Sequence, residues 1–185
     1  QVSMEGKTYR LPQPFMVLAT QNPVETYGTY HLPEAQMDRF LMKISMGYPE
    51  KEEELAILRR SADAAPANLS AVISLEEIVV LKEKVEHIHI SPRLEEYIVN
   101  LAEATRDSEY IRLGVSPRGS LALHRTARAY AVLCGRDYVL PDDIKFLAPF
   151  VLTHRIIISP KGKSVLGSPE EVLAQLLRTL TVPTE

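Results

Sequence analysis

The sequence predicts an α/β segment followed by an all-α domain. Two apolar strand candidates, residues 15–20 and 40–46, dominate the first part, whereas four well-marked helix starts follow in the second. With 185 residues, 45% of them hydrophobic, the chain can bury a sizeable core. A stretch of small residues at 63–73 predicts the boundary, so we assign 1–65 and 66–185 to the two domains.

The first elements along the chain are predicted to be extended. QVSM and KTYRL, separated by Glu5-Gly6, are typical of a short hairpin. The segment FMVLATQNP at 15–23 places five apolar residues before a polar end, as a buried strand does when it reaches a sheet edge. The chain starts inside the hairpin without an initiator methionine, so we expect a truncated protein. From Pro49 the pattern turns helical.

The helices of the second part are marked by their capping residues. Each start combines an N-cap serine with a glutamate three residues later, or with proline at the first helical position. The helix after Ser116 is expected to reach residue 134 before Gly135, another to span 141–153, and 155–158 to form a strand or hairpin arm. The predicted starts are Ser74 with Glu77, Ser91-Pro92, Ser116-Pro117, and Ser168-Pro169 with Glu171.

Composition restricts the class of protein. The net charge of -3 gives no overall field that would attract nucleic acid or an anionic membrane. The single cysteine, Cys134, excludes an internal disulfide, favours a reducing compartment and is expected to pack as a small buried side chain. The chain shows no signal peptide and no apolar window of about 18 residues, so we expect a cytoplasmic protein without a membrane span.

Two polar residues in the first part are candidates for chemistry. Asn22 would lie beyond the carboxyl end of a strand, where an amide can hold a water and touch a phosphate, although Asn-Pro could equally initiate a turn. Arg39 follows Asp38, so it could form a surface ion pair or act as a finger that neutralises a transferring phosphoryl group. Spacing alone does not choose between these alternatives.

Arg118 is a stronger candidate because the sequence contains a control. Ser-Pro-Arg occurs at 91–93 and at 116–118, both times opening a helix. Acidic residues follow Arg93 at once, whereas no acid lies between Ser116 and Ala131. Cations at a helix N-terminus are unfavourable, so an anion is the expected missing partner of Arg118.

Three other signals are weak. The tripeptide Gly162-Lys163-Ser164 lacks the upstream glycine of a phosphate loop and is expected to be a hairpin turn. His87 and His89 would share one face of a strand, but no third metal ligand accompanies them. No nucleophile with its base is evident.

Three separated stretches, taken together, resemble one family. They are LATQNPVETYGTYHLPEAQMDRF, the second strand candidate followed by GYPEKEEE, and VSPRGSLALHRTARAYAVLCGRDYVLPDDI. In this order they closely resemble the MoxR family of AAA+ ATPases over essentially the whole chain. The resemblance implies the C-terminal part of an AAA+ P-loop NTPase core over 1–65, followed by the helical lid domain over 66–185.

The resemblance also implies a role for each candidate residue. Asn22 matches sensor 1, which orients the attacking water near the γ-phosphate. Arg39 matches the arginine finger, which acts on ATP bound by the neighbouring subunit. Arg118 matches sensor 2 of the lid, acting either on its own subunit's ATP or on the neighbour's.

The Walker A loop and the Walker B acidic pair of the family are missing from this sequence, and we expect them upstream of Gln1. They would cradle ATP and bind Mg²⁺, so hydrolysis is expected of the intact protein and not of this chain alone. Family members are hexameric, chaperone-like ATPases that mature other complexes, often beside a von Willebrand factor A-domain protein. The resemblance thus implies a homo-oligomeric ring and client complexes.

Two alternatives from other classes remain. A DNA-binding helical module could use the basic residues between 118 and 128, although the acidic net charge disfavours it. A non-enzymatic interaction domain is the other.

Overall fold

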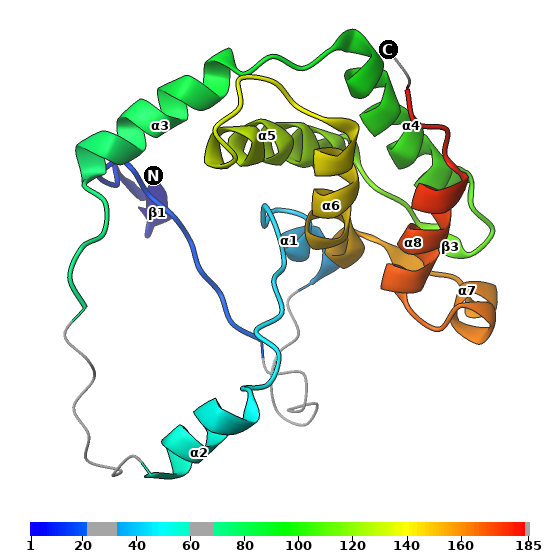
Figure 1. Ribbon diagram of the computed structural model, residues 1–185, viewed down its shortest axis with the longest axis horizontal. Helices are drawn as coiled ribbons and strands as arrows, with labels where there is room; N and C mark the ends of the chain where they lie inside the picture. Colours follow the sequence, from blue (N-terminus) through cyan, green and yellow to red (C-terminus); the bar gives the residue numbers. More distant parts are fainter. Residues whose placement is uncertain (22–32, 60–68, 184–185) are drawn as a thin grey trace.

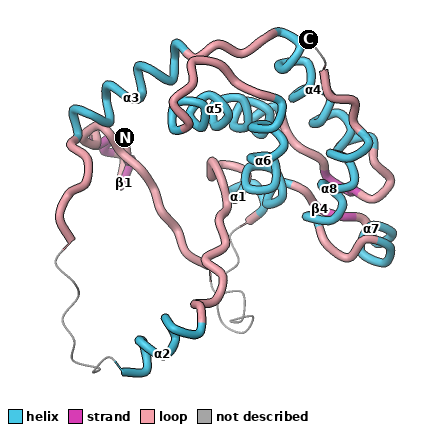
Figure 2. Tube along the Cα trace, in the orientation of Figure 1, coloured by secondary structure: helices cyan, strands magenta, loops and turns pink. Residues whose placement is uncertain are grey.

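The structure, a computed structural model, describes residues 1–21, 33–59 and 69–183 (Figure 1). The described part is mostly helical, with strands paired in two small two-stranded sheets (Figure 2). We call residues 1–59 the N-terminal region and residues 88–180 the helical region. In chain order the elements are β1 Val2–Met4, β2 Lys7–Tyr9, α1 Glu34–Met37, α2 Lys51–Arg59, α3 Leu75–His87, α4 Pro92–Asp107, β3 Ile111–Leu113, α5 Pro117–Leu133, α6 Pro141–Leu152, the 3₁₀ turn η1 Thr153–Arg155, β4 Ile157–Ile158, α7 Pro160–Val165 and α8 Pro169–Thr179.

The predicted N-terminal hairpin is confirmed. Strands β1 and β2 pair antiparallel, with Val2 opposite Tyr9. The turn between them uses Glu5 at φ 52° and Gly6 at φ 77°. Successive left-handed residues suit the twist of a two-residue hairpin.

The two larger strand predictions are wrong for this structure. Residues 15–20 have no regular secondary structure, and Leu18 is 86% exposed. A β-strand is defined by its backbone hydrogen bonds to a neighbouring strand, and no described strand lies beside this segment to pair with it. Residues 40–46 also form no strand, and the Lys43 amide donates to the Phe150 carbonyl of the helical region at 2.8 Å.

Helix starts were predicted far better. Ser74 and Glu77 form the expected capping box of α3, and Ser91 caps α4 by accepting from the Leu94 amide at 3.3 Å. Ser168 accepts from the Glu171 amide at the start of α8. These bonds need only residues a few positions apart, so the sequence pattern suffices to find them.

Helix α5 lies at the centre of the helical region and packs most extensively against α6 (Figures 1 and 2). It ends as predicted, with Cys134 as C-cap and Gly135 at φ 70°. Cys134 is exposed, contrary to the prediction that it packs in the core. The fully buried core side chains include Leu101 of α4, Leu123 of α5, Ile144 of α6 and Leu173 of α8.

Two further predictions need correction. Gly162-Lys163-Ser164 lies in α7 and is not a hairpin turn. Gly162 is needed there because a Cβ atom would lie 2.2 Å from the Tyr110 carbonyl oxygen. His87 ends α3 and His89 forms an isolated bridge with Tyr138, so they do not share a strand face.

Candidate functional site

The structure places two of the three candidate residues, since Asn22 lies outside the described residues. Arg39 follows α1 in a turn, where its amide donates to the Gln36 carbonyl at 3.1 Å. Its side chain is exposed and makes no hydrogen bond or ion pair with any described residue. Arg118 is the second residue of α5, and 57% of its side chain is exposed.

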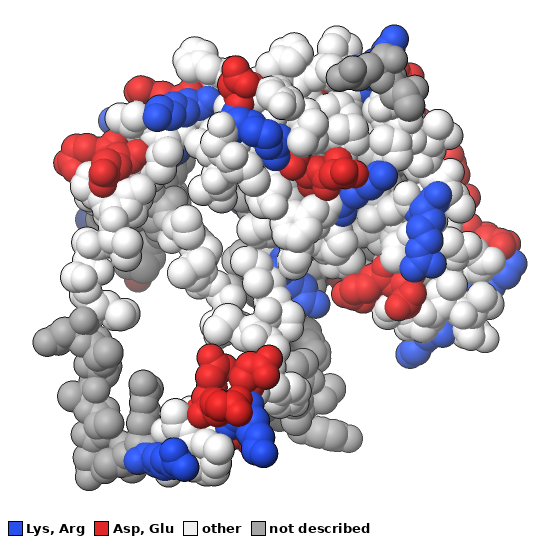
Figure 3. All heavy atoms as spheres, in the orientation of Figure 1, with Lys and Arg blue, Asp and Glu red and all other residues white. Residues whose placement is uncertain are grey.

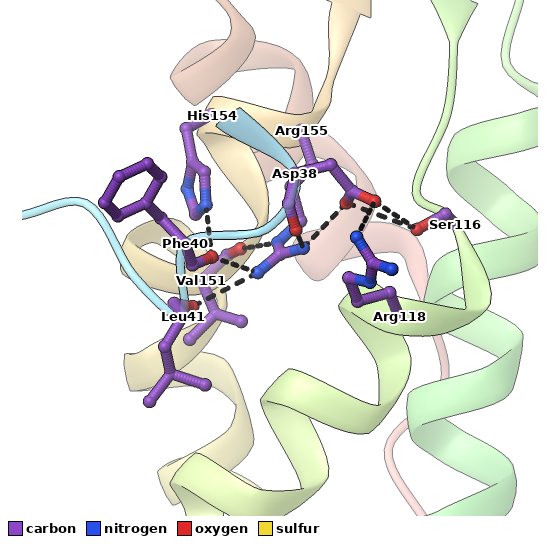
Figure 4. Close-up of polar contacts among 8 residues, drawn as sticks. All are labelled: Asp38, Phe40, Leu41, Ser116, Arg118, Val151, His154 and Arg155. Carbon is purple, nitrogen blue, oxygen red and sulfur yellow. Dashed lines mark hydrogen bonds and ion pairs between the residues drawn. The ribbon is translucent and has the colours of Figure 1, made fainter. Parts of the chain in front are cut away.

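A carboxylate from the N-terminal region meets the start of α5 (Figure 4). The Ser116 hydroxyl donates to both carboxylate oxygens of Asp38, at 3.2 and 3.1 Å. The Arg118 Nη1 atom lies 3.9 Å from Oδ2 of the same group. In this structure Asp38 is therefore the anion that the acid-free start of α5 was predicted to need, and it suits the positive end of the helix dipole.

Ser116 differs from the other predicted N-caps. Its hydroxyl accepts no capping bond from α5, and it donates to Asp38. The helix still begins at Pro117 as predicted. The serine that was interpreted as a cap thus connects the two regions of the chain.

Arg155 of η1 holds the same segment from the other side. Its Nη1 atom lies 2.7 Å from Oδ1 of Asp38 and also donates to the Asp38 carbonyl. Its Nη2 atom donates to the carbonyls of Phe40 and Leu41 (Figure 4). Asp38 thus pairs with Arg155 and Arg118, and not with Arg39 as the surface ion-pair alternative had it.

His154 adds a further bond to this segment. Its Nε2 atom lies 3.2 Å from the Phe40 carbonyl oxygen, so Nε2 must carry the hydrogen. The Nδ1 atom is buried without a partner among the described residues, as suits an unprotonated nitrogen. Burial lowers the pKa of His154, and the nearby cations Arg155 and Lys43 lower it further, against the opposing effects of the Phe40 carbonyl and Asp38.

Two other basic residues of α5, His124 and Arg128, have structural partners, whereas Arg125 is exposed. His124 Nε2 lies 3.3 Å from Oε1 of Glu95, and Arg128 donates to the carbonyls of Ile88 and Glu86. On the face seen in Figure 3, acidic and basic side chains alternate over the helical region. These contacts leave α5 little continuous positive surface for a DNA groove.

Sequence reasoning missed Asp38, Ser116 and Arg155 as members of this site. Arg155 was assigned to a strand or hairpin arm, although only 2% of its side chain is exposed. The signal was present: one arginine stands within the apolar run VLTHRIII, and a charge in such a run predicts a buried, paired group.

The described residues hold no cluster of three or more His, Cys, Asp or Glu side chains suited to a metal ion. Every helix in the described ranges is too short or too polar to cross a lipid bilayer.

Comparison with family models places two matches along this chain. Residues 1–42 match the model of the ATPase family associated with various cellular activities (AAA). Residues 103–176 match the model of the AAA lid domain, and they include Arg118 and Arg155. The site therefore lies where the end of an AAA match meets an AAA lid match.

The chain is similar to several longer proteins. The Bacillus subtilis protein YeaC is 45% identical over the whole chain, which covers 58% of YeaC. The chaperone MoxR1 of Mycobacterium tuberculosis is 39% identical over 98% of the chain, which covers 50% of MoxR1. A crystal structure of a Cytophaga hutchinsonii protein, described as an ATPase candidate, superposes with a TM-score of 0.84 at 38% identity, over 99% of this chain and 58% of that one. The chain thus spans about half the length of the curated relatives it matches.

Proposed function

Since the chain belongs to the MoxR family of AAA ATPases, with part of an AAA domain followed by the helical lid, we propose that the intact protein hydrolyses ATP to drive a chaperone-like remodelling of other proteins. Asn22 is proposed as sensor 1, Arg39 as the arginine finger and Arg118 as sensor 2. The proposed domain boundary remains 1–65 and 66–185.

The observation that carries the proposal is the environment of Arg39. Its guanidinium is exposed and unpaired among the described residues, while its neighbours Asp38 and Phe40 are bound to the helical region. An arginine finger needs this combination, because its side chain must reach a phosphate outside its own segment while its backbone is held in place.

Arg118 is proposed to serve the same phosphate as Arg39. It lies 3.9 Å from the carboxylate of Asp38, the residue before Arg39, so both arginines belong to the same contact between the N-terminal and helical regions. If Arg39 acts on the ATP of a neighbouring subunit, Arg118 then acts there too. The long, half-exposed ion pair to Asp38 is weak enough to exchange for a phosphate oxygen.

ATP and Mg²⁺ are the proposed cofactors. Two exposed guanidiniums at this contact fit the charge of a terminal phosphate. A finger that acts on a neighbour requires a homo-oligomer, proposed as a hexameric ring. Client complexes and a von Willebrand factor A-domain protein are the proposed partners.

Mixing of full-length subunits tests the finger and its direction of action. Arg39→Ala and Asn22→Ala should each lower turnover, Arg39→Ala by about 10³-fold or more if it removes a finger. The two variants are then mixed as inactive subunits. In a random equal mixture of Asn22→Ala and Arg39→Ala subunits, about a quarter of sites would pair an intact Asn22 with an intact Arg39 of the neighbour, so part of the activity should return. Arg39→Ala mixed with Arg118→Ala should recover nothing.

The control is Arg112→Ala, which removes another exposed arginine, 3.9 Å from Glu34. It should retain turnover. Full turnover in Arg39→Ala would refute the finger assignment, and loss of turnover without recovery in the Asn22→Ala mixture would refute action on a neighbouring site.

A further inference from the structure

We propose that Arg155 is a positioning residue for the arginine finger, holding Arg39 in place by binding the backbone on both sides of it. The inference rests on the proposed function of Arg39. It assigns to the helical region a direct part in placing a catalytic group of the N-terminal region.

The hydrogen bonds of Arg155 carry the proposal. A guanidinium has five N–H donors, and Arg155 uses them all. One goes from Nε to the Val151 carbonyl at 2.8 Å, within its own part of the fold. The others go to residues 38–41: to the carbonyl and the carboxylate of Asp38, and to the carbonyls of Phe40 and Leu41.

These acceptors bracket Arg39 along the chain. The carbonyl oxygens of Asp38 and Phe40 belong to the residues immediately before and after it, and one planar group binds both (Figure 4). The rigid fork of a guanidinium fixes the relative positions of its acceptors. The Arg39 backbone is thereby restrained while its side chain remains exposed.

The helical region is shaped to hold this guanidinium. Only 2% of the Arg155 side chain is exposed, and a buried charge of this kind requires a partner, which Asp38 supplies. Gly119 of α5 leaves room for its stem, because a Cβ atom there would lie 3.1 Å from Cδ of Arg155 and 2.5 Å from Cγ1 of Val115. The bonds from η1 and α5 thus hold residues 38–41 against the helical region.

The test uses the full-length oligomer with Arg155→Ala and Arg155→Lys. A misplaced finger should lower kcat by about 10²-fold with little change in KM for ATP. Arg155→Lys keeps the charge, but its ammonium cannot reproduce the planar fork, so it should recover only part of kcat. Asp38→Asn, which keeps the carbonyl acceptors, should lower kcat less than Arg155→Ala does.

Arg136→Ala is the matched control. Arg136 also forms a two-point ion pair within the helical region, with its Nη atoms 2.8 and 2.7 Å from the Asp143 carboxylate, and has no bond to residues 38–41. If Arg155 serves only the stability of the helical region, both alanine variants should lower kcat alike at equal fractions folded. A loss of kcat in the Arg155 variants that Arg136→Ala does not show supports the positioning role.

A double variant separates positioning from general damage. On an Arg39→Ala background, Arg155→Ala should lower kcat by no more than about twofold further, because the group it positions is already absent. Mixed oligomers give a second measure: Arg155→Ala subunits should be rescued by Asn22→Ala subunits and not by Arg39→Ala subunits. An undiminished effect of Arg155→Ala in the double variant would overturn the inference.

The outcomes also distinguish this inference from the proposed function. If Arg39→Ala keeps full turnover, the proposed function fails and the positioning role fails with it. If Arg39→Ala loses turnover while Arg155→Lys, which retains the charge, keeps it fully, only the positioning role fails. Should Arg155→Ala not assemble, Arg155→Lys and Asp38→Asn still decide between these outcomes.

Discussion

The helical region and the N-terminal region of this chain are stabilised in different ways. In the helical region the apolar side chains bury one another, and Leu123 of α5 is fully inaccessible. In the N-terminal region comparable side chains face solvent: Leu18 is 86% exposed and Met46 97%. A helix completes its backbone bonds within itself and needs only one packed face, whereas a strand needs neighbours in a sheet. The segment that matches the AAA family model therefore keeps its apolar sequence, although its described residues form no sheet beyond the β1–β2 hairpin.

Residues 38–43 are the exception within the N-terminal region. Their conformation is fixed by contacts with the helical region: the bonds from Arg155 and Ser116, and the bond from the Lys43 amide to the Phe150 carbonyl. The side chain of Met42 also packs against the helical core. Residues 38–43 thus behave structurally as a part of the helical region, although they are remote from it in sequence.

The largest expected effect comes from truncating matched leucines in the two regions. Leu123→Ala should lower the free energy of unfolding by about 2–5 kcal/mol, because it leaves a cavity in a closed core. Leu18→Ala should change it by less than about 0.5 kcal/mol, because the side chain is already exposed. Urea denaturation of this chain followed by circular dichroism measures both.

The same leucine pair in the full-length protein sharpens the contrast. There Leu18 should lie in a complete sheet, and Leu18→Ala should become destabilising by about 2 kcal/mol or more. Equal and small effects of Leu18→Ala in both proteins would mean that residues 15–20 are not a buried strand of the AAA domain.

The two regions also differ in what the sequence could predict. Ser74, Ser91 and Ser168 signal helix starts through bonds to residues three positions on, so pattern alone located α3, α4 and α8. Segment 40–46 has a strand-like apolar pattern, but Arg155, more than a hundred residues away, uses two of its carbonyls. Single-sequence reasoning has no access to such contacts.

The candidate site shows the same division. Arg118 was identified because the absence of acids nearby is a local observation, but its anion, Asp38, lies 80 residues earlier and could not be located by spacing. Asn22 and Arg39 were given roles by the family resemblance and not by their own surroundings. The roles of all three stay predictions.

A smaller effect is expected from two serines that look alike in sequence. Ser91→Ala should cost about 1 kcal/mol of stability by removing the cap of α4. Ser116→Ala should lower the free energy of unfolding less, since its hydroxyl does not cap α5, but it should loosen residues 38–43. Amide exchange at Lys43, bonded to Phe150, should speed up only in the Ser116 variant. Faster exchange in Ser91→Ala alone would contradict this difference.

The smallest expected effect is a pH dependence of amide exchange, confined to residues 38–43 where they contact the helical region. The pKa of His154 is lowered in the folded protein, first by burial and then by Arg155 and Lys43. Its neutral form is therefore favoured by folding, and this contribution is complete above the ordinary histidine pKa of about 6.5. It is lost as the pH falls through the lower folded-state value.

Protonation of His154 would place a new N–H at Nδ1, which has no acceptor among the described residues, beside the buried charge of Arg155. We expect acidification below about pH 6.5 to raise amide exchange at Lys43, relative to its intrinsic rate, before the helical region unfolds. His154→Gln should keep a donor toward the Phe40 carbonyl without titrating, and so should remove the pH dependence. NMR titration of the His154 ring gives an independent measurement, and an ordinary or raised pKa there would show that this imidazole is not buried against residues 38–43.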